Sequence, residues 1–250
     1  MAKMGAVYCV YDSSAFLNES VQRIYPLMDR IVFMLNTKPW YGDSVSNEPL
    51  NTYMRISSMP DPDEKFAILI GPWQDEAFQR NLGLEFLRNR KIDWCLIVDD
   101  DELFDRSELG LVKGMLETAV HAAYLMYHQI YWKNRETVIE GLFGSFPTIA
   151  RTNGTVNFNK DRMILVNSPH TWFSISANNI VCHHMSYVHS DEEMYRKIKN
   201  FSHANDIIPD WYTKKWLNWK EGDIDLHPSV GKCFKRTLSV RDSEYRLQSI

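Results

Sequence analysis

Four consecutive carboxylates are the residues of this sequence best suited to do chemistry. Asp99, Asp100, Asp101 and Glu102 follow directly on the apolar run Trp94–Val98. Their mutual repulsion at the end of a buried segment calls for a positive counter-charge. Because side chains alternate along an extended chain, Asp99 and Asp101 are predicted to point to one side, where a divalent cation would bridge them. Oxygen ligands favour Mg²⁺ or Mn²⁺. The competing interpretation is a solvated acidic turn that also caps the next helix.

The segments around this cluster follow the pattern of an α/β fold. Short apolar runs alternate with polar or helical stretches, and each run is continuous enough to be covered on both faces. We therefore predict a parallel sheet of residues 6–11, 30–35, 65–70 and 93–98, with helices on apolar stripes at Leu17–Met28 and Phe78–Phe86. Open α/β sheets bind ligands at the carboxyl ends of their strands, which is where the carboxylates lie.

The rest of the chain is less regular. Residues 39–62 are rich in Pro, Asn, Ser and Gly and are predicted to form a long surface loop. After residue 105 the pattern is mixed rather than βαβ, and a capping box of Ser190 and Glu193 predicts a helix over 191–204. We further predict a helix capped by Ser107 and strands at 122–132, 162–166 and 179–184. Without a repeat or a clean linker, residues 1–250 are interpreted as one domain.

Composition excludes several classes of protein. The 250 residues are 44% hydrophobic and 24% charged, which excludes a disordered or collagen-like chain. A net charge of −4 argues against a stable nucleic-acid partner. Four widely spaced cysteines favour a reducing, cytoplasmic setting over a disulfide framework. No stretch approaches the roughly 18 to 20 apolar residues of a membrane span, so we expect at most peripheral membrane contact.

Two stretches of the first hundred residues resemble a known family. Residues 77–84, AFQRNLGL, followed by residues 93–102, DWCLIVDDDE, are similar to the "aRNxGl … yilflDxDE" signature of family-two-like glycosyltransferases of the A-type (GT-A) fold. Tyr11-Asp12 with Asn18-Glu19 is similar to the "yNE" that follows the first strand of that family. The resemblance covers residues 5–105, and it includes a DxD motif at Asp99–Asp101.

The resemblance implies a fold and an activity. The fold is a Rossmann-like GT-A domain, in which residues 1–105 bind a nucleotide sugar and residues 106–250 bind the acceptor and complete the metal site. The activity is metal-dependent transfer of a sugar, with a UDP-sugar as the favoured donor, to an acceptor hydroxyl of a carbohydrate or another molecule. A divalent ion across the diphosphate would stabilise the charge that develops on the leaving group.

The same resemblance assigns expected roles to residues of the first half. Asp99 and Asp101 would hold Mn²⁺ or Mg²⁺. Arg80 would steady the diphosphate or the DxD carboxylates, because a guanidinium bridges two oxygens; the alternative is an ordinary surface arginine. The residues expected around the rest of the nucleotide sugar are Tyr11, Asp12, Asn36, Trp40 and Asp100.

A third metal ligand is expected from the second half. Residues 183–188, HHMSYV, resemble an "HxSYV" segment of some bacterial and phage members of the family. Neighbouring residues on a strand face opposite ways, so only one of the two histidines would reach the metal. We prefer His184, with His183 as the alternative. A histidine with a purely structural role is the competing interpretation.

The catalytic base is left open by the sequence. Inverting members of the family use an acid of the second half, commonly in an "ED" or "HE" pair, and this chain lacks an ED pair there. His170 stands near the expected position of an HE pair and is one candidate, with Glu140 and Asp161 as the others; a retaining reaction is the remaining alternative. Aromatic residues that would stack on an acceptor sugar, or else belong to the core, are Tyr131, Trp132, Trp172 and Phe173.

Two rival functions stay open beside sugar transfer. A nucleotidyltransferase would also gather acids around metal ions, but residues 12–15 lack the glycine-rich loop or lysine that such an enzyme places near its first strand. A non-catalytic carbohydrate-binding protein of the same fold is the other rival, and the intact DxD motif argues against it.

Overall fold

A mostly parallel sheet forms the centre of the molecule. The computed structural model describes residues 2–40, 48–160, 162–200 and 204–248. Four parallel strands of the first half lie in the order β3-β2-β1-β4. They are β1 (Met4–Val10), β2 (Arg30–Asn36), β3 (Phe66–Gly71) and β4 (Trp94–Val98). The parallel sheet predicted from the four apolar runs is confirmed.

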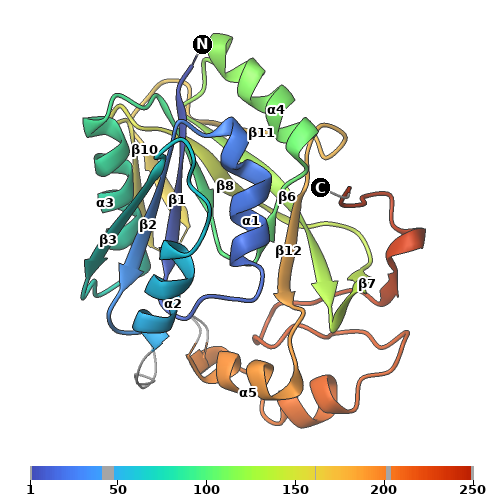
Figure 1. The fold of residues 1–250 in the computed structure, drawn as a ribbon. Helices are drawn as coiled ribbons and strands as arrows, with labels where there is room; N and C mark the ends of the chain where they lie inside the picture. The colour runs from blue at the N-terminus through green and yellow to red at the C-terminus, as the bar shows by residue number, and fades with distance from the viewer. Residues whose placement is uncertain (1, 41–47, 161, 201–203, 249–250) are drawn as a thin grey trace.

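Helices cover both faces of this sheet (Figure 1). On one face α1 (Leu17–Ile24) and α4 (Arg106–Met115) bury their apolar stripes in one core cluster with the strands. On the other face α3 (Glu76–Asn89) packs through Leu84 and Leu87 into a second cluster. Both faces of the parallel strands are therefore shielded from water, as their nearly continuous apolar sequences require.

The second half extends the same sheet with strands of both directions. β8 is antiparallel to both β4 and β6, which makes β6 run in the same direction as β4. The remaining strands are β5 (Glu102–Leu103), β6 (Ala123–Trp132), β7 (Asn134–Ile139), β8 (Phe143–Arg151), β9 (Val156–Lys160), β10 (Met163–Val166), β11 (Trp172–Ser174), β12 (Cys182–Tyr187) and β13 (Thr237–Ser239). The predicted fold class is confirmed: a Rossmann-like α/β arrangement, with a mainly parallel central sheet, helices on both faces and a mixed C-terminal half.

Several predicted elements differ from the structure. The predicted loop 39–62 contains α2 (Glu48–Ser57), and Pro49 is compatible with this helix because it lies in the first turn, where its missing N–H costs no helical hydrogen bond. The helix after residue 105 is capped by Asp105, whose carboxylate accepts the N–H groups of Ser107 and Glu108. In α3 the predicted inner residue Phe78 is 52% exposed.

The helices α5 (Asp191–Asn200) and α2 lie at the end of the molecule where the parallel strands have their carboxyl ends (Figure 1). The predicted capping box starts α5: Glu193 accepts the backbone N–H of Ser190, and the Ser190 hydroxyl accepts the N–H of Glu193. β12 joins the second half of the chain to the acidic segment, because it pairs in parallel with β6 and antiparallel with β5. Residues of the second half are thereby brought beside the acidic cluster that follows β4.

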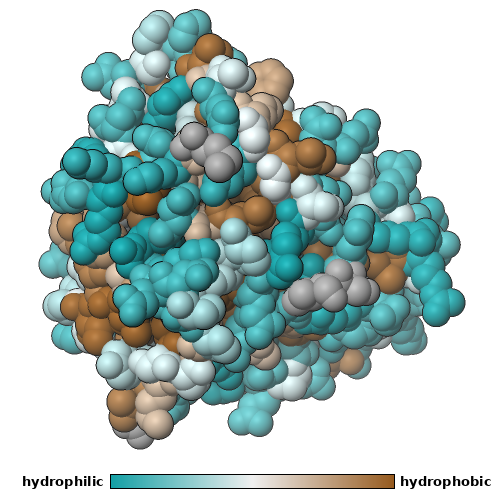
Figure 2. Space-filling model, turned by 45° about the horizontal axis from the view of Figure 1, so that its top comes forward, coloured by the Kyte–Doolittle hydropathy of each residue, from teal (hydrophilic) through white to brown (hydrophobic). Residues whose placement is uncertain are grey.

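The helices are short and the surface is mixed in character. Among the residues that the structure describes, no helix combines the length and the apolar character needed to cross a bilayer. Figure 2 shows a face on which hydrophobic side chains form several separate patches among hydrophilic ones.

Gly83 permits α3 to approach β1 closely. A Cβ atom at this position would lie 2.6 Å from Cγ1 of Val7, in the buried contact between helix and strand. We predict that Gly83→Ala lowers the free energy of unfolding by about 1–3 kcal/mol in urea titrations, because overpacking forces the helix away from the sheet. The matched control is Gly114→Ala in α4, where nothing lies within 4 Å of the added Cβ. Equal stabilities of the two variants would contradict this packing.

Candidate functional site

A cavity of about 520 Å³ opens at the carboxyl ends of β1, β2 and β4. Its walls come from both halves of the chain, since β6, β12 and α5 also contribute side chains. Of the residues predicted from the sequence, those that line it are Tyr11, Asp12, Asn36, Trp40, Asp99, Asp100, Asp101 and His184. The size is that of a pocket for a small-molecule ligand.

The acidic cluster forms a tight turn and not a continuation of the strand. β4 ends at Val98, and the N–H of Glu102 donates to the carbonyl of Asp99 at 3.0 Å. The predicted strand alternation is therefore not what orients Asp99 and Asp101. Both side chains reach the cavity from the turn, but each contacts a different set of cations.

Asp99 is held by two arginines. Its carboxylate lies 2.9 Å from Nη2 of Arg80 and 3.5 Å from Nη2 of Arg162. Burial alone would raise the pKa of Asp99, but the two guanidinium groups outweigh it and the pKa is lowered. Arg80 is 1% exposed and also pairs with Glu76. Of the two predicted contacts of Arg80, the structure contains the one with a DxD carboxylate.

Asp101 is held by a histidine and a lysine. Its Oδ1 lies 3.2 Å from Nε2 of His184, and its Oδ2 lies 2.9 Å from Nζ of Lys197 on α5. Burial would raise the pKa of Asp101, but Lys197 and His184 hold it well below its usual range. For His184 the effect is opposite: burial would lower its pKa, and the Asp101 carboxylate raises it.

Glu102 is fully buried and bound by Arg162. Arg162 donates from Nη1 to Oε1 at 2.5 Å and from Nη2 to Oε2 at 2.6 Å, and Glu102 Oε2 also accepts the N–H of Asp99 at 3.0 Å. This two-pronged pair fixes the turn to the segment between β9 and β10. The carboxylate therefore has a structural partner on each oxygen.

Asp100 and Asp12 lie on the β1 side of the cavity. Asp100 accepts the backbone N–H of Ser14, which ties the acidic turn to the loop after β1. Burial and the neighbouring Asp101 raise the pKa of Asp100 to about 7. Partial burial and the nearby carboxylate of Glu48 raise the pKa of Asp12 to about 6.

The two histidines of the HHMSYV segment face opposite sides of β12, as predicted. His184 faces the cavity and Asp101. His183 is 2% exposed and its Nδ1 lies 3.0 Å from the Tyr131 hydroxyl on the other face. Strand alternation thus places His184, and not His183, beside the acidic turn.

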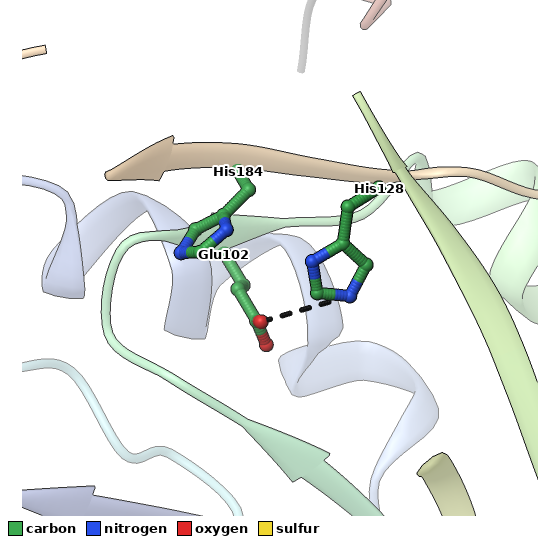
Figure 3. A group of neighbouring side chains, drawn as sticks. All are labelled: Glu102, His128 and His184. Carbon is green, nitrogen blue, oxygen red and sulfur yellow. Dashed lines mark ion pairs between the residues drawn. The ribbon is translucent and has the colours of Figure 1, made fainter. Parts of the chain in front are cut away.

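A second histidine, His128 of β6, lies behind His184. Glu102, His128 and His184 each offer a donor atom within 4.8 Å of the others, and Figure 3 shows them converging from β5, β6 and β12. Burial holds the pKa of His128 well below its usual range, which leaves a neutral imidazole. Its Nε2 is buried, lies 3.9 Å from Glu102 Oε1 and has no hydrogen-bond partner among the described residues.

These donors fit a divalent cation best at Asp101 and His184. Adjacent ligand atoms around such an ion are about 3 Å apart, and the Oδ1 of Asp101 and the Nε2 of His184 are 3.2 Å apart. Glu102 is less suited, because a cation there would meet the Arg162 guanidinium. One imidazole beside carboxylates suits Mn²⁺ better than Mg²⁺.

Asn36 and Trp40, which are expected near the nucleotide, form side-chain hydrogen bonds with other residues of the chain. The side-chain amide of Asn36 donates to the carbonyl of Trp73 and accepts its N–H, at 2.9 and 3.0 Å. The indole of Trp40 donates to Gln79 at 2.9 Å. Asn36 therefore shapes the loop after β3, while both residues still line the cavity.

None of the candidates for the catalytic base lines the cavity among the described residues. The carbonyl of His170 accepts the N–H of Ala122, which places His170 beside the beginning of β6, and the site lies at the other end of that strand. Glu140 pairs with Arg236. Asp161 lies outside the described residues.

The aromatic residues beside the acidic turn are not those expected from the sequence. Trp132 and Tyr131 are buried in the core, and Trp172 and Phe173 are exposed near the start of β6. The aromatic wall of the cavity consists of Phe143, Phe146, Tyr187, His227 and Phe234. For Tyr131 and Trp132 the structure therefore agrees with the alternative, a place in the core, and neither Trp172 nor Phe173 lines the cavity.

Arg162, Lys197 and His128 are the site residues that the sequence did not indicate. Arg162 and Lys197 lie 60 and 96 residues from the carboxylates they bind. The sequence around His128 is typical of a buried core strand. His128 could have been predicted only from the side-chain alternation of β6 together with its pairing to β12, and that pairing is not known until the register of the sheet is known.

Comparisons with known proteins give distant matches only. No family model matches the sequence, and no curated protein does. Similar solved structures include mannose-1-phosphate geranyltransferase from Thermus thermophilus (13% identity, TM-score 0.36, 62% of this chain and 51% of that one). Others are 4-diphosphocytidyl-2C-methyl-D-erythritol synthase (9%, 0.45, 78% and 96%) and S. aureus TarS 1-349 (14%, 0.45, 78% and 62%).

This chain therefore spans about half the length of the geranyltransferase and less than two thirds of the TarS chain. All three TM-scores lie below 0.5, so any functional conclusion depends on the chain's own residues.

The pair of Arg162 and Glu102 should be the main electrostatic support of the turn. We predict that Arg162→Met lowers the free energy of unfolding by about 3–5 kcal/mol, because it leaves a fully buried carboxylate without its cation. The control is Arg135→Met, whose side chain is 46% exposed and pairs with Glu19; its loss should be below about 1 kcal/mol. Urea titrations of both variants measure this, and equal losses would contradict the assignment.

Proposed function

We propose that this protein transfers a sugar from a nucleoside diphosphate sugar to an acceptor hydroxyl, with a divalent cation held at the DxD motif. The observation that supports this best is the pairing of Asp101 with His184 in the lining of a cavity at the carboxyl ends of parallel strands. Such strand ends are where open α/β sheets bind nucleotides.

The charges around the cavity suit a diphosphate. Lys38, Arg196, Lys197 and Lys232 all line it. Phosphate oxygens would find cations there, and Asp101 with His184 would hold Mn²⁺ or Mg²⁺. When bound, the ion supplies a fixed positive charge against the diphosphate leaving group.

The chain's own residues would keep the site in position for this chemistry. Arg80 and Arg162 hold Asp99, and the Ser14 backbone holds Asp100, so the turn is fixed before a ligand arrives. Fixed charges need no rearrangement during the reaction. Tyr11, Asp12 and Trp40 would lie on the nucleotide side.

The acceptor would enter from the aromatic wall. The Phe143 ring contacts those of Phe146, His227 and Phe234, and all four line the cavity. Aromatic faces stack on the apolar face of a sugar ring. The base that deprotonates the acceptor is not assigned among the described residues, and Asp161 stays a prediction.

The first test is nucleotide binding measured by thermal shift. With Mn²⁺ present, a nucleoside diphosphate should raise the melting temperature of the protein, and Asp101→Asn should abolish the rise because the ion loses its carboxylate. The matched control is Asp105→Asn, the same change four residues along the chain, where asparagine caps α4 as well as aspartate does. Absence of any nucleotide effect on the unmodified protein would exclude the proposal.

The reaction products distinguish sugar transfer from nucleotidyl transfer. Slow hydrolysis of a nucleotide sugar should release a nucleoside diphosphate without pyrophosphate. Release of pyrophosphate from a nucleoside triphosphate in the presence of a sugar phosphate would instead identify a nucleotidyltransferase.

A further inference from the structure

Lys197 contacts the DxD motif from outside the acidic turn and its sheet. It projects from α5, and its Nζ lies 2.9 Å from Asp101 Oδ2, 3.0 Å from the carbonyl of Ser186 and 3.1 Å from the Ser186 hydroxyl. Nε2 of His189 is 3.3 Å away. The lysine thus occupies one oxygen of the carboxylate that is also the best-placed metal ligand.

Binding of a divalent cation and of the Lys197 ammonium to the Asp101 carboxylate at the same time is electrostatically unfavourable. Like charges a few ångströms apart repel strongly in a partly desolvated site, and the side chain of Asp101 is only 8% exposed. Nε2 of His184, on the other oxygen, is an atom that can bind a metal ion. The Lys197 ammonium offers hydrogen-bond donors only, so it cannot serve as a ligand and has to leave the carboxylate oxygen.

The Lys197 side chain has room to move away from Asp101. Its side chain is 28% exposed, it lines the cavity, and its four-carbon stem is flexible. Arg196, the preceding residue, lines the same cavity, and its ion pair with Glu48 is long, at 3.9 Å. The two residues thus place two cations at the wall of the cavity.

We propose that Lys197 is an internal counter-ion of the DxD motif, which a divalent cation displaces from Asp101 and which then binds the phosphate oxygens of the donor. This inference rests on the proposed function, because it concerns the same site. It predicts that Lys197 weakens binding of the metal alone and strengthens binding of the nucleotide once the metal is present.

The test measures two affinities of one variant, Lys197→Met. In titrations followed by electron paramagnetic resonance, Mn²⁺ alone should bind the variant at least about tenfold more tightly than the unmodified protein, because a competing charge is gone. In saturating Mn²⁺, a nucleoside diphosphate should bind the variant about tenfold more weakly in calorimetry, because one phosphate contact is lost. Opposite changes in the two affinities are not expected from mere damage to the fold.

Two further variants serve as controls. Lys199→Met removes the same charge from the same helix, where Nζ lies over the Tyr195 ring at 3.9 Å and not in the cavity, so both affinities should stay unchanged. Lys197→Arg keeps the charge and should behave as the unmodified protein does with Mn²⁺ alone. It also keeps the inference testable if Lys197→Met does not fold.

The outcomes separate this inference from the proposed function. If Mn²⁺ binds the unmodified protein and Lys197→Met binds it equally or more weakly, the inference is wrong while the proposed function stands. The inference is also wrong if Lys197→Arg binds Mn²⁺ more tightly than the unmodified protein. If neither Mn²⁺ nor a nucleotide binds the unmodified protein, the proposed function fails, and the inference fails with it.

Discussion

The structure of the site depends on holding four adjacent carboxylates together at the end of one buried strand, three of them by cations and Asp100 by the backbone N–H of Ser14. Their repulsion is offset by cations that come from different elements: Arg80 from α3, Arg162 from the segment between β9 and β10, His184 from β12 and Lys197 from α5. A buried charge is tolerated only when it is paired. The acidic turn therefore fixes where the helices and strands of both halves must meet.

This arrangement explains why the two sides of the turn behave differently. Asp99 lines the cavity but is held by Arg80 and Arg162, and Glu102 is fully buried against Arg162, so both carboxylates are bound to the protein's own guanidinium groups. Asp101 faces the cavity with His184 on one oxygen and the partly exposed, flexible Lys197 on the other, so it is the carboxylate that can exchange a partner. The same sequence motif thus divides into a structural half and a half that is available to a ligand.

The features that could be predicted from the sequence are those carried by local periodicity. Apolar runs predicted the parallel sheet, and strand alternation separated His184 from His183. The pairs of Arg162 and Lys197 with the turn were beyond prediction, because they join segments 60 and 96 residues apart through a register that no local pattern encodes. The helix α2 was missed because its composition resembles a loop.

The most direct measurement for the central claim is an anomalous diffraction map of crystals grown with Mn²⁺ and a nucleoside diphosphate. We predict an anomalous peak between the carboxylate of Asp101 and Nε2 of His184, with the diphosphate beside it and the nucleotide base toward Asp12. A peak between Glu102 and His128, or a nucleotide outside this cavity, would contradict the claim.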